Sequence, residues 1–167
     1  MEASKKLQIT TNSIREHGFK FLELIPDTED LTLITLKGHL IIEEILYFIV
    51  IKHCQFPKYI AEARLSFSQL SSLTKAMINV PIHDCVFPAI DKLNKLRNNL
   101  AHNITPDKAI KLAKEFVNLC DPQRNKDLTL PQQVRYSIVY VLGQLTAIGS
   151  VSEKLKGLDL KNDINFV

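Results

Sequence analysis

The stretch from Leu31 to Ile51 most constrains the fold, because as a helix it would be apolar on most of its circumference. A helix of this kind is either buried at the centre of a protein or spans a membrane. Lys37, His39, Glu43 and Glu44 interrupt the stretch, which argues against a membrane span. We therefore predict a helix over about residues 31–53 at the centre of a helical bundle, with no contact with a membrane.

Composition supports an all-α chain. Among 167 residues there are five glycines, seven prolines and no tryptophan, and hydrophobic residues make up 46%. Few tight turns and many helix formers favour helices, and this length suits one domain with its own hydrophobic core. We predict a helical domain over residues 1–157 and a loose C-terminal tail over residues 158–167.

Five more helices follow from apolar residues at helical spacing and from capping signals. Ser66 can cap one helix, and Thr105 followed by Pro106 can open another. Pro131 opens the last helix, whose apolar stripe begins at Val134. The predicted ranges are about 4–24, 66–78, 84–102, 105–120 and 131–157.

The net charge and the cysteines of the chain exclude few classes of function. A net charge of +3 neither supports nor opposes binding to nucleic acid. Cys54, Cys85 and Cys120 lie far apart, and no C-x-x-C or H-x-x-x-H spacing occurs. The N-terminus lacks the apolar core of a signal peptide. We expect a cytoplasmic protein with reduced thiols, no metal and no cofactor.

The segment Arg97-Asn-Asn-Leu-Ala-His102 gathers chemically active side chains at the end of one predicted helix. Residues three or four apart share a helical face, so Asn94, Asn98 and His102 form one stripe with Arg97 at its border. An imidazole can move a proton at a ribose 2′-OH or at a leaving 5′-oxygen. A guanidinium can neutralise charge on the phosphate. These are the kinds of group that metal-independent cleavage of RNA requires.

The same segment also fits a simpler structural role. Arg97 and His102 would lie favourably near the negative end of the helix dipole, and asparagine is common where helices end. Residue types and spacing alone favour this structural interpretation.

Two parts of the chain resemble the HEPN superfamily. The segment Leu93–His102 resembles its R-x-x-x-x-H signature, including the polar residue that often follows the arginine. The segment Lys37–Leu46 resembles the acid-bearing second helix of these proteins. The order of elements, about five helices with the signature late in the fourth, extends the resemblance over most of the chain.

The resemblance implies a fold, an activity and partners. HEPN proteins form up-and-down bundles of four or five helices, and many are endoribonucleases of toxin–antitoxin or phage-defence systems. They act as homodimers in which two signatures face one composite cleft. The resemblance thus implies RNA as substrate, an antitoxin protein as a possible partner, and Arg97, Asn98 and His102 as catalytic residues. A non-catalytic HEPN module that binds RNA, nucleotide or a partner protein is the alternative.

At one position the sequence differs from the pattern of a subgroup of the family. HEPN toxins that are paired with a nucleotidyltransferase antitoxin usually have a tyrosine two residues after the histidine. Here that position is Ile104. The resemblance therefore does not extend to that subgroup.

Glu43 and Asn94 are the predicted supporting residues. A carboxylate on an apolar stripe needs a partner, because burying it alone costs several kcal/mol. We predict that Glu43 pairs with Arg97, and a pair with His39 one turn earlier is the alternative. The stripe assigned to Glu43 comprises Leu36, Leu40, Tyr47 and Val50.

Further RNA contacts are expected beside the signature. Lys92 and Lys95 can guide a phosphate backbone, although exposed lysines on a helix are usually only solvated. Phe48, Phe56 and Tyr59 can stack on unpaired bases, although aromatic residues at such spacings more often lie in the core.

Overall fold

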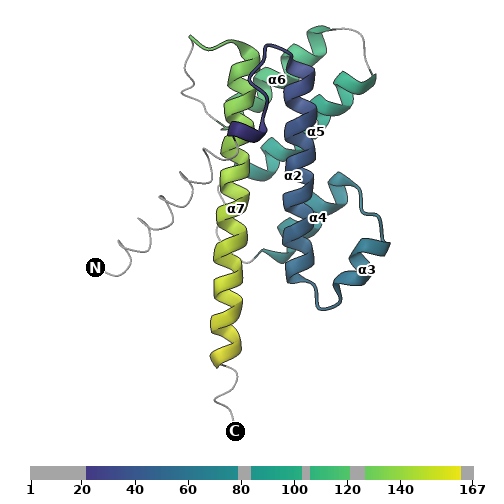
Figure 1. The fold of residues 1–167 in the computed structure, drawn as a ribbon, viewed down its shortest axis with the longest axis vertical. Helices are drawn as coiled ribbons and strands as arrows, with labels where there is room; N and C mark the ends of the chain where they lie inside the picture. The colour runs from purple at the N-terminus through teal and green to yellow at the C-terminus, as the bar shows by residue number, and fades with distance from the viewer. Residues whose placement is uncertain (1–21, 79–83, 103–105, 121–126, 163–167) are drawn as a thin grey trace, which may run out of the picture.

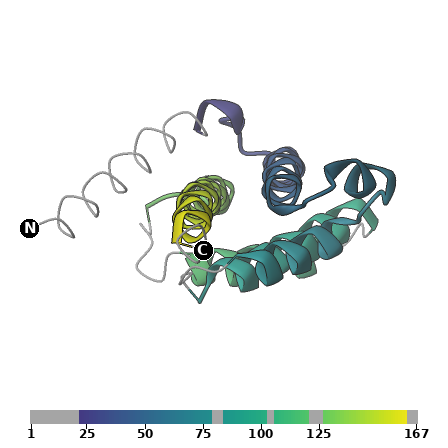
Figure 2. The same ribbon diagram turned by 90° about the horizontal axis from the view of Figure 1, so that it is seen from below.

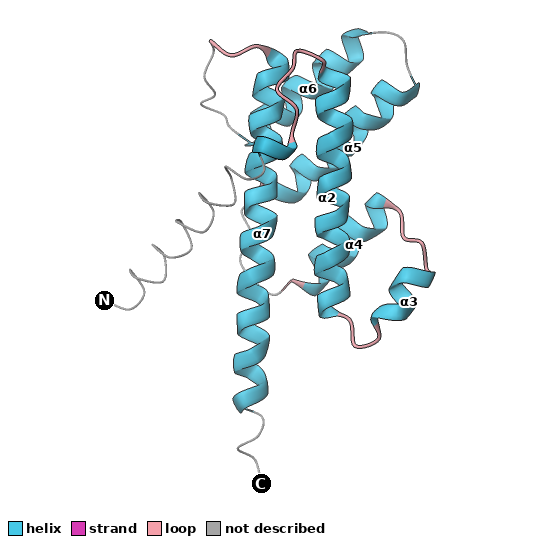
Figure 3. Ribbon diagram, viewed as in Figure 1, coloured by secondary structure: helices cyan, strands magenta, loops and turns pink. Residues whose placement is uncertain are grey.

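Six helices form most of the part of the chain that the computed structural model describes, which is residues 22–78, 84–102, 106–120 and 127–162, with side chains up to residue 147. Within these ranges the chain contains no strand (Figure 3). The helices are α2 (Leu31–His53), α3 (Pro57–Glu62), α4 (Phe67–Met77), α5 (Val86–His102), α6 (Pro106–Cys120) and α7 (Leu130–Asn162).

The helices pack in two layers. The long helices α2 and α7 lie side by side and contact each other (Figure 1). Seen from below, with α2 and α7 end on, α4, α5 and α6 form a second layer (Figure 2), and this layer crosses the first obliquely (Figure 1). Helix α5 packs against α6 and also contacts α2, α4 and α7. The oblique crossing makes this all-α domain less regular than the predicted up-and-down bundle.

Helix α2 begins at a strong cap and turns one face to the core. The Asp30 carboxylate accepts hydrogen bonds from the backbone N–H groups of Thr32 and Leu33, at 2.9 and 3.1 Å. The buried side of the helix includes Ile34, Gly38, His39, Ile42 and Leu46.

The stripe predicted for Glu43 is therefore largely wrong. Leu40 is 59% exposed and Tyr47 is 37% exposed, whereas Val50 of the same predicted stripe is buried. Glu43 itself is half-buried, at the border of the two faces. An all-round apolar helix does not indicate which side its neighbours will cover, so its core face could not be chosen from the pattern.

Gly38 lets α2 and α7 approach closely. A Cβ atom at this position would lie 2.6 Å from Ile138 Cδ1 and 2.8 Å from Ile138 Cγ2. Ile138 is fully buried, so it has little room to move away. The glycine is thus required by packing between the two long helices.

Most helix predictions are confirmed, and two details differ. The helices over 31–53, 66–78, 84–102 and 105–120 match α2, α4, α5 and α6, and Ser66 forms the expected cap of α4. The short helix α3, with Pro57 in its first turn, was not predicted. Helix α7 continues to Asn162, so residues 158–162 are helical and not part of a loose tail. The helix expected over 4–24 falls mostly outside the described residues. No helix in the described ranges is long and apolar enough to cross a membrane.

Replacing Gly38 with alanine should destabilise the protein. Alanine favours the helix by up to about 1 kcal/mol, but overpacking a filled core typically costs about 1–3 kcal/mol. We expect the free energy of unfolding to fall by about 1 kcal/mol, measured by urea denaturation. In an Ile138→Ala background, which removes the clashing atoms, Gly38→Ala should be neutral or stabilising. Equal effects in both backgrounds would contradict this packing argument.

Candidate functional site

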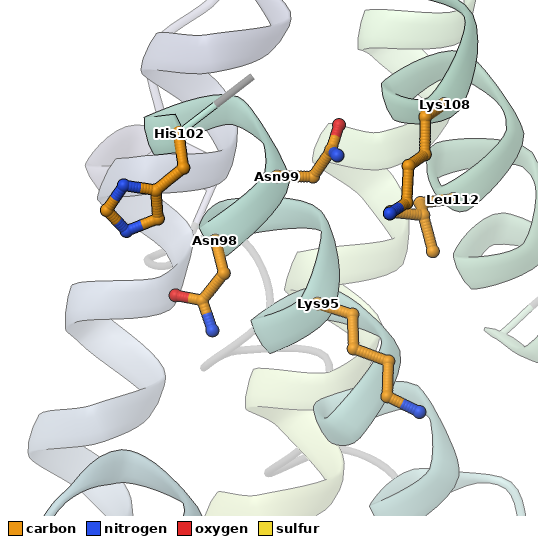
Figure 4. Close-up of a pocket in the computed structure, with 6 residues that line it drawn as sticks. All are labelled: Lys95, Asn98, Asn99, His102, Lys108 and Leu112. Carbon is orange, nitrogen blue, oxygen red and sulfur yellow. The ribbon is translucent and has the colours of Figure 1, made fainter.

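The C-terminal end of α5 and the first half of α6 enclose an open pocket. Its volume is about 360 Å³. Helix α5 contributes four polar side chains and α6 contributes one cation and one apolar side chain (Figure 4). The lining residues are Lys95, Asn98, Asn99, His102, Lys108 and Leu112. The pocket therefore joins part of the predicted signature to residues of the next helix.

His102 and Asn98 form the exposed edge of this pocket. They are one helical turn apart, both are exposed, and their side chains extend to the same side of α5 (Figure 4). Arg97 is half-buried and does not line the pocket, but its Nη1 donates a hydrogen bond to Asn98 Oδ1 at 3.1 Å. Asn98 thereby links the guanidinium to the pocket.

Asn94 does not join that exposed edge. Its Oδ1 lies 3.1 Å from His39 Nε2, and its Nδ2 donates to Ser68 Oγ at 3.4 Å. His39 is buried and stacks on Phe67 with ring centroids 4.0 Å apart. These contacts join α2, α4 and α5 at one point. Asn94 therefore anchors the helix one turn before Asn98.

The ion pair predicted between Glu43 and Arg97 is not formed within the described ranges. The alternative pair between Glu43 and His39 is not formed there either. The charges of Glu43 and Arg97 nevertheless both shift the pKa of His39. Burial lowers the pKa of His39 below its ordinary value of 6.5, and the charge of Arg97 lowers it too. The Asn94 hydrogen bond and the charge of Glu43 raise it, by less than burial and Arg97 together lower it. A neutral ring that donates from Nε2 to Asn94 Oδ1 fits this environment.

The two predicted RNA-contacting lysines have different surroundings. Lys95 is exposed and lines the pocket. Lys92 is half-buried, and its Nζ lies 2.6 Å from Glu115 Oε2 on α6. The hydrogen bond from Lys92 holds the pKa of Glu115 below its usual value. Lys92 was expected on the exposed side, but it faces α6 because the two helices pack along each other.

Asn99 is a site residue that sequence reasoning missed. It is only 5% exposed, it lines the pocket, and its Oδ1 has no hydrogen-bond partner. It follows Leu93 and Leu96 at a spacing of three residues, on the buried face of α5. That spacing was the available signal, because it puts an amide where a leucine would continue the core.

The three aromatic residues considered for base stacking lie on the surface, near the junction of α2 and α3. Phe48, Phe56 and Tyr59 are each more than half exposed. Lys52 Nζ lies 4.7 Å from the Phe48 ring centroid, and Lys58 Nζ lies 4.8 Å from that of Tyr59. The expectation that such residues belong to the core is wrong for all three.

No family model, curated protein or solved structure matches the chain. Within the described ranges, no three His, Cys, Asp or Glu side chains gather closely enough to hold a metal ion. Ile104 lies outside the described residues. Any functional assignment therefore depends on the chemistry of the pocket and on the resemblance of the signature.

Acidification should weaken the fold through His39. Because its folded pKa lies below 6.5, the unfolded chain binds more protons as the pH falls through 6.5. The stabilisation is complete above 6.5 and is lost toward the lower folded pKa. We expect the free energy of unfolding to decrease between about pH 7.5 and 5 in urea titrations, and His39→Gln to reduce that slope. Equal slopes for the two proteins would contradict this role of His39.

Proposed function

We propose that the chain is a metal-independent endoribonuclease of the HEPN class, with Arg97, Asn98 and His102 at its catalytic site. The observation that carries the proposal is the pocket edge at the end of α5. An exposed imidazole and an amide lie there one turn apart, the amide contacts a guanidinium, and two lysines line the same pocket. The cognate system would be of the toxin–antitoxin or phage-defence kind, acting in the cytoplasm.

Each of these groups has a task in cleavage. His102 takes the proton from a ribose 2′-OH, or gives one to the leaving 5′-oxygen, as the O2′–P bond forms and the P–O5′ bond breaks. The products are a 2′,3′-cyclic phosphate and a 5′-OH. Arg97 stabilises the charge of the pentacoordinate phosphate, and Asn98 orients both the guanidinium and the substrate. Lys95 attracts the RNA backbone.

A second copy of the chain would complete the site. The pocket of one copy contains one imidazole, whereas the reaction uses both a proton acceptor and a proton donor. Leu33, Leu40 and Tyr47, spaced seven residues apart, give α2 a narrow stripe of exposed apolar side chains. Burial of such a stripe against its counterpart favours a symmetric dimer. We therefore propose a homodimer with a composite cleft.

His102→Ala should abolish RNA cleavage. The assay incubates purified protein with varied single-stranded RNAs in EDTA and follows the fragments on gels. We expect a rate loss of at least about 100-fold, the lower end of what a positioned acid or base contributes. Thermal unfolding should be unchanged, because His102 is exposed.

Two controls accompany this assay. Lys114→Ala changes an exposed residue of α6 that does not line the pocket, and it should cut RNA normally. DNA of the same sequence should remain intact, because it lacks the attacking hydroxyl. If clean, dimeric wild-type protein binds these RNAs but cuts none of them, the non-catalytic module is the better description.

Leu40→Lys should separate the dimer. Placing a charge in the middle of an apolar interface leaves it unpaired and desolvated, so the variant should be monomeric in light scattering after gel filtration. Cleavage should fall with dimer content. Ile110→Lys, at an exposed apolar residue of α6, is the matched control and should remain dimeric. A wild-type protein that is monomeric throughout the accessible concentration range would rule out the composite cleft.

A further inference from the structure

We propose that Asn99 reads the base of one unpaired nucleotide in the pocket between α5 and α6, with a preference for adenine. Lys95 and Lys108 hold the phosphates that flank this nucleotide. The inference rests on the proposed function for its substrate, RNA. It adds a specificity-determining residue outside the resemblance to known proteins, together with the α6 lysine.

Asn99 occupies a position on the buried face of α5 where an apolar residue would be expected. Leu93, Leu96 and Asn99 follow one another on the buried face, so an apolar side chain at 99 would extend the core. A buried amide oxygen without a partner is destabilising, because it has lost its hydrogen bonds to water without gaining others. Few buried polar groups remain unpaired in folded proteins, and such a group calls for a specific explanation. A ligand that hydrogen-bonds to the amide supplies one.

Two lysines line the same pocket as Asn99. Asn99 lines the pocket together with Lys95, one turn earlier on α5, and Lys108 on the facing helix α6 (Figure 4). Further along the two helices, the ion pair between Lys92 and Glu115 ties α5 to α6. The pocket is therefore cationic beside the buried amide, which suits a nucleotide with negatively charged phosphates.

The chemistry of the amide favours adenine. Rotation about the Cβ–Cγ bond of Asn99 turns either end of the amide toward the pocket, so the group offers one donor and one acceptor. Adenine presents a complementary pair, since N6 donates to Oδ1 while N7 accepts from Nδ2. Such a bidentate pair typically discriminates against other bases by roughly 5- to 150-fold. The side chain of Leu112 supplies apolar contact for the ring.

Binding of uncleavable RNA tests the inference independently of catalysis. Fluorescent 2′-O-methyl oligonucleotides of adenine or of uracil lack the attacking hydroxyl, and their affinities are measured by anisotropy. Wild-type protein should prefer the adenine probe by about tenfold, which corresponds to about 1.4 kcal/mol. Asn99→Leu should bind both probes equally and unfold at a higher temperature, because it removes a buried unpaired amide. Asn99→Ala leaves the pocket open and should also lose the preference.

The role of Lys108 is tested by comparing two lysine variants of α6. Lys108→Ala should lower the affinity for both probes alike. It should also reduce the slope of log affinity against log salt concentration by about the amount expected for one lost phosphate contact. Lys114→Ala, on the same helix but outside the pocket, should change neither quantity.

Three outcomes would overturn the inference: wild-type protein without a preference between the probes or without binding, a preference that survives both Asn99 variants, or equal losses from the two lysine variants. Loss of the proposed nuclease activity is a separate result. If nothing is cut but the adenine preference depends on Asn99, the pocket assignment stands. If RNA is cut but neither cleavage nor binding depends on the base, the assignment of Asn99 as the base-reading residue fails.

Discussion

The burial of α2 against α7 on one side and against α4 and α5 on the other is the constraint on which the site depends. Gly38 permits the close approach of α7, and its neighbour His39 contacts Asn94 of α5. One turn of α2 thus sets the spacing within the first layer and anchors the second layer. The polar end of α5 extends beyond this anchor, where it meets α6. Changes at Gly38 would therefore be expected to disturb the pocket as well as the core.

The helices of the described region could be predicted because their signals are local. Capping by Ser66, proline at the start of α6 and apolar residues at helical spacing are properties of short segments. Leu93 and Leu96, three residues apart on α5, are buried, as apolar residues at helical spacing indicate. The all-α, single-domain character needed nothing more. The oblique crossing of the layers depends on how side chains of different helices interlock, which no local pattern contains.

The orientation of individual polar side chains could not be predicted for the same reason. Glu43 lies on a helix that is apolar all round, so its side of α2 became known only once the neighbouring helices were placed. Lys92 has the sequence surroundings of a solvated lysine, but α6 provides Glu115 as a partner. Asn99 could not be distinguished from the adjacent Asn98 by residue type. Residues 98 and 99 are turned by about 100° from each other, so one is exposed and the other buried.

The polar residues of α5 consequently divide between two tasks. Asn94 is engaged by His39 and Ser68, which fixes the helix, whereas Asn98 and His102 face solvent at the pocket edge. Asn99 belongs to neither group, since it is buried like an anchor but has an unpartnered oxygen. A purely structural end to α5 would explain Arg97 and His102 by the helix dipole, but it would not explain a buried amide where leucine would be more stable. Asn99 is therefore the residue that most favours a binding role for this end of the helix.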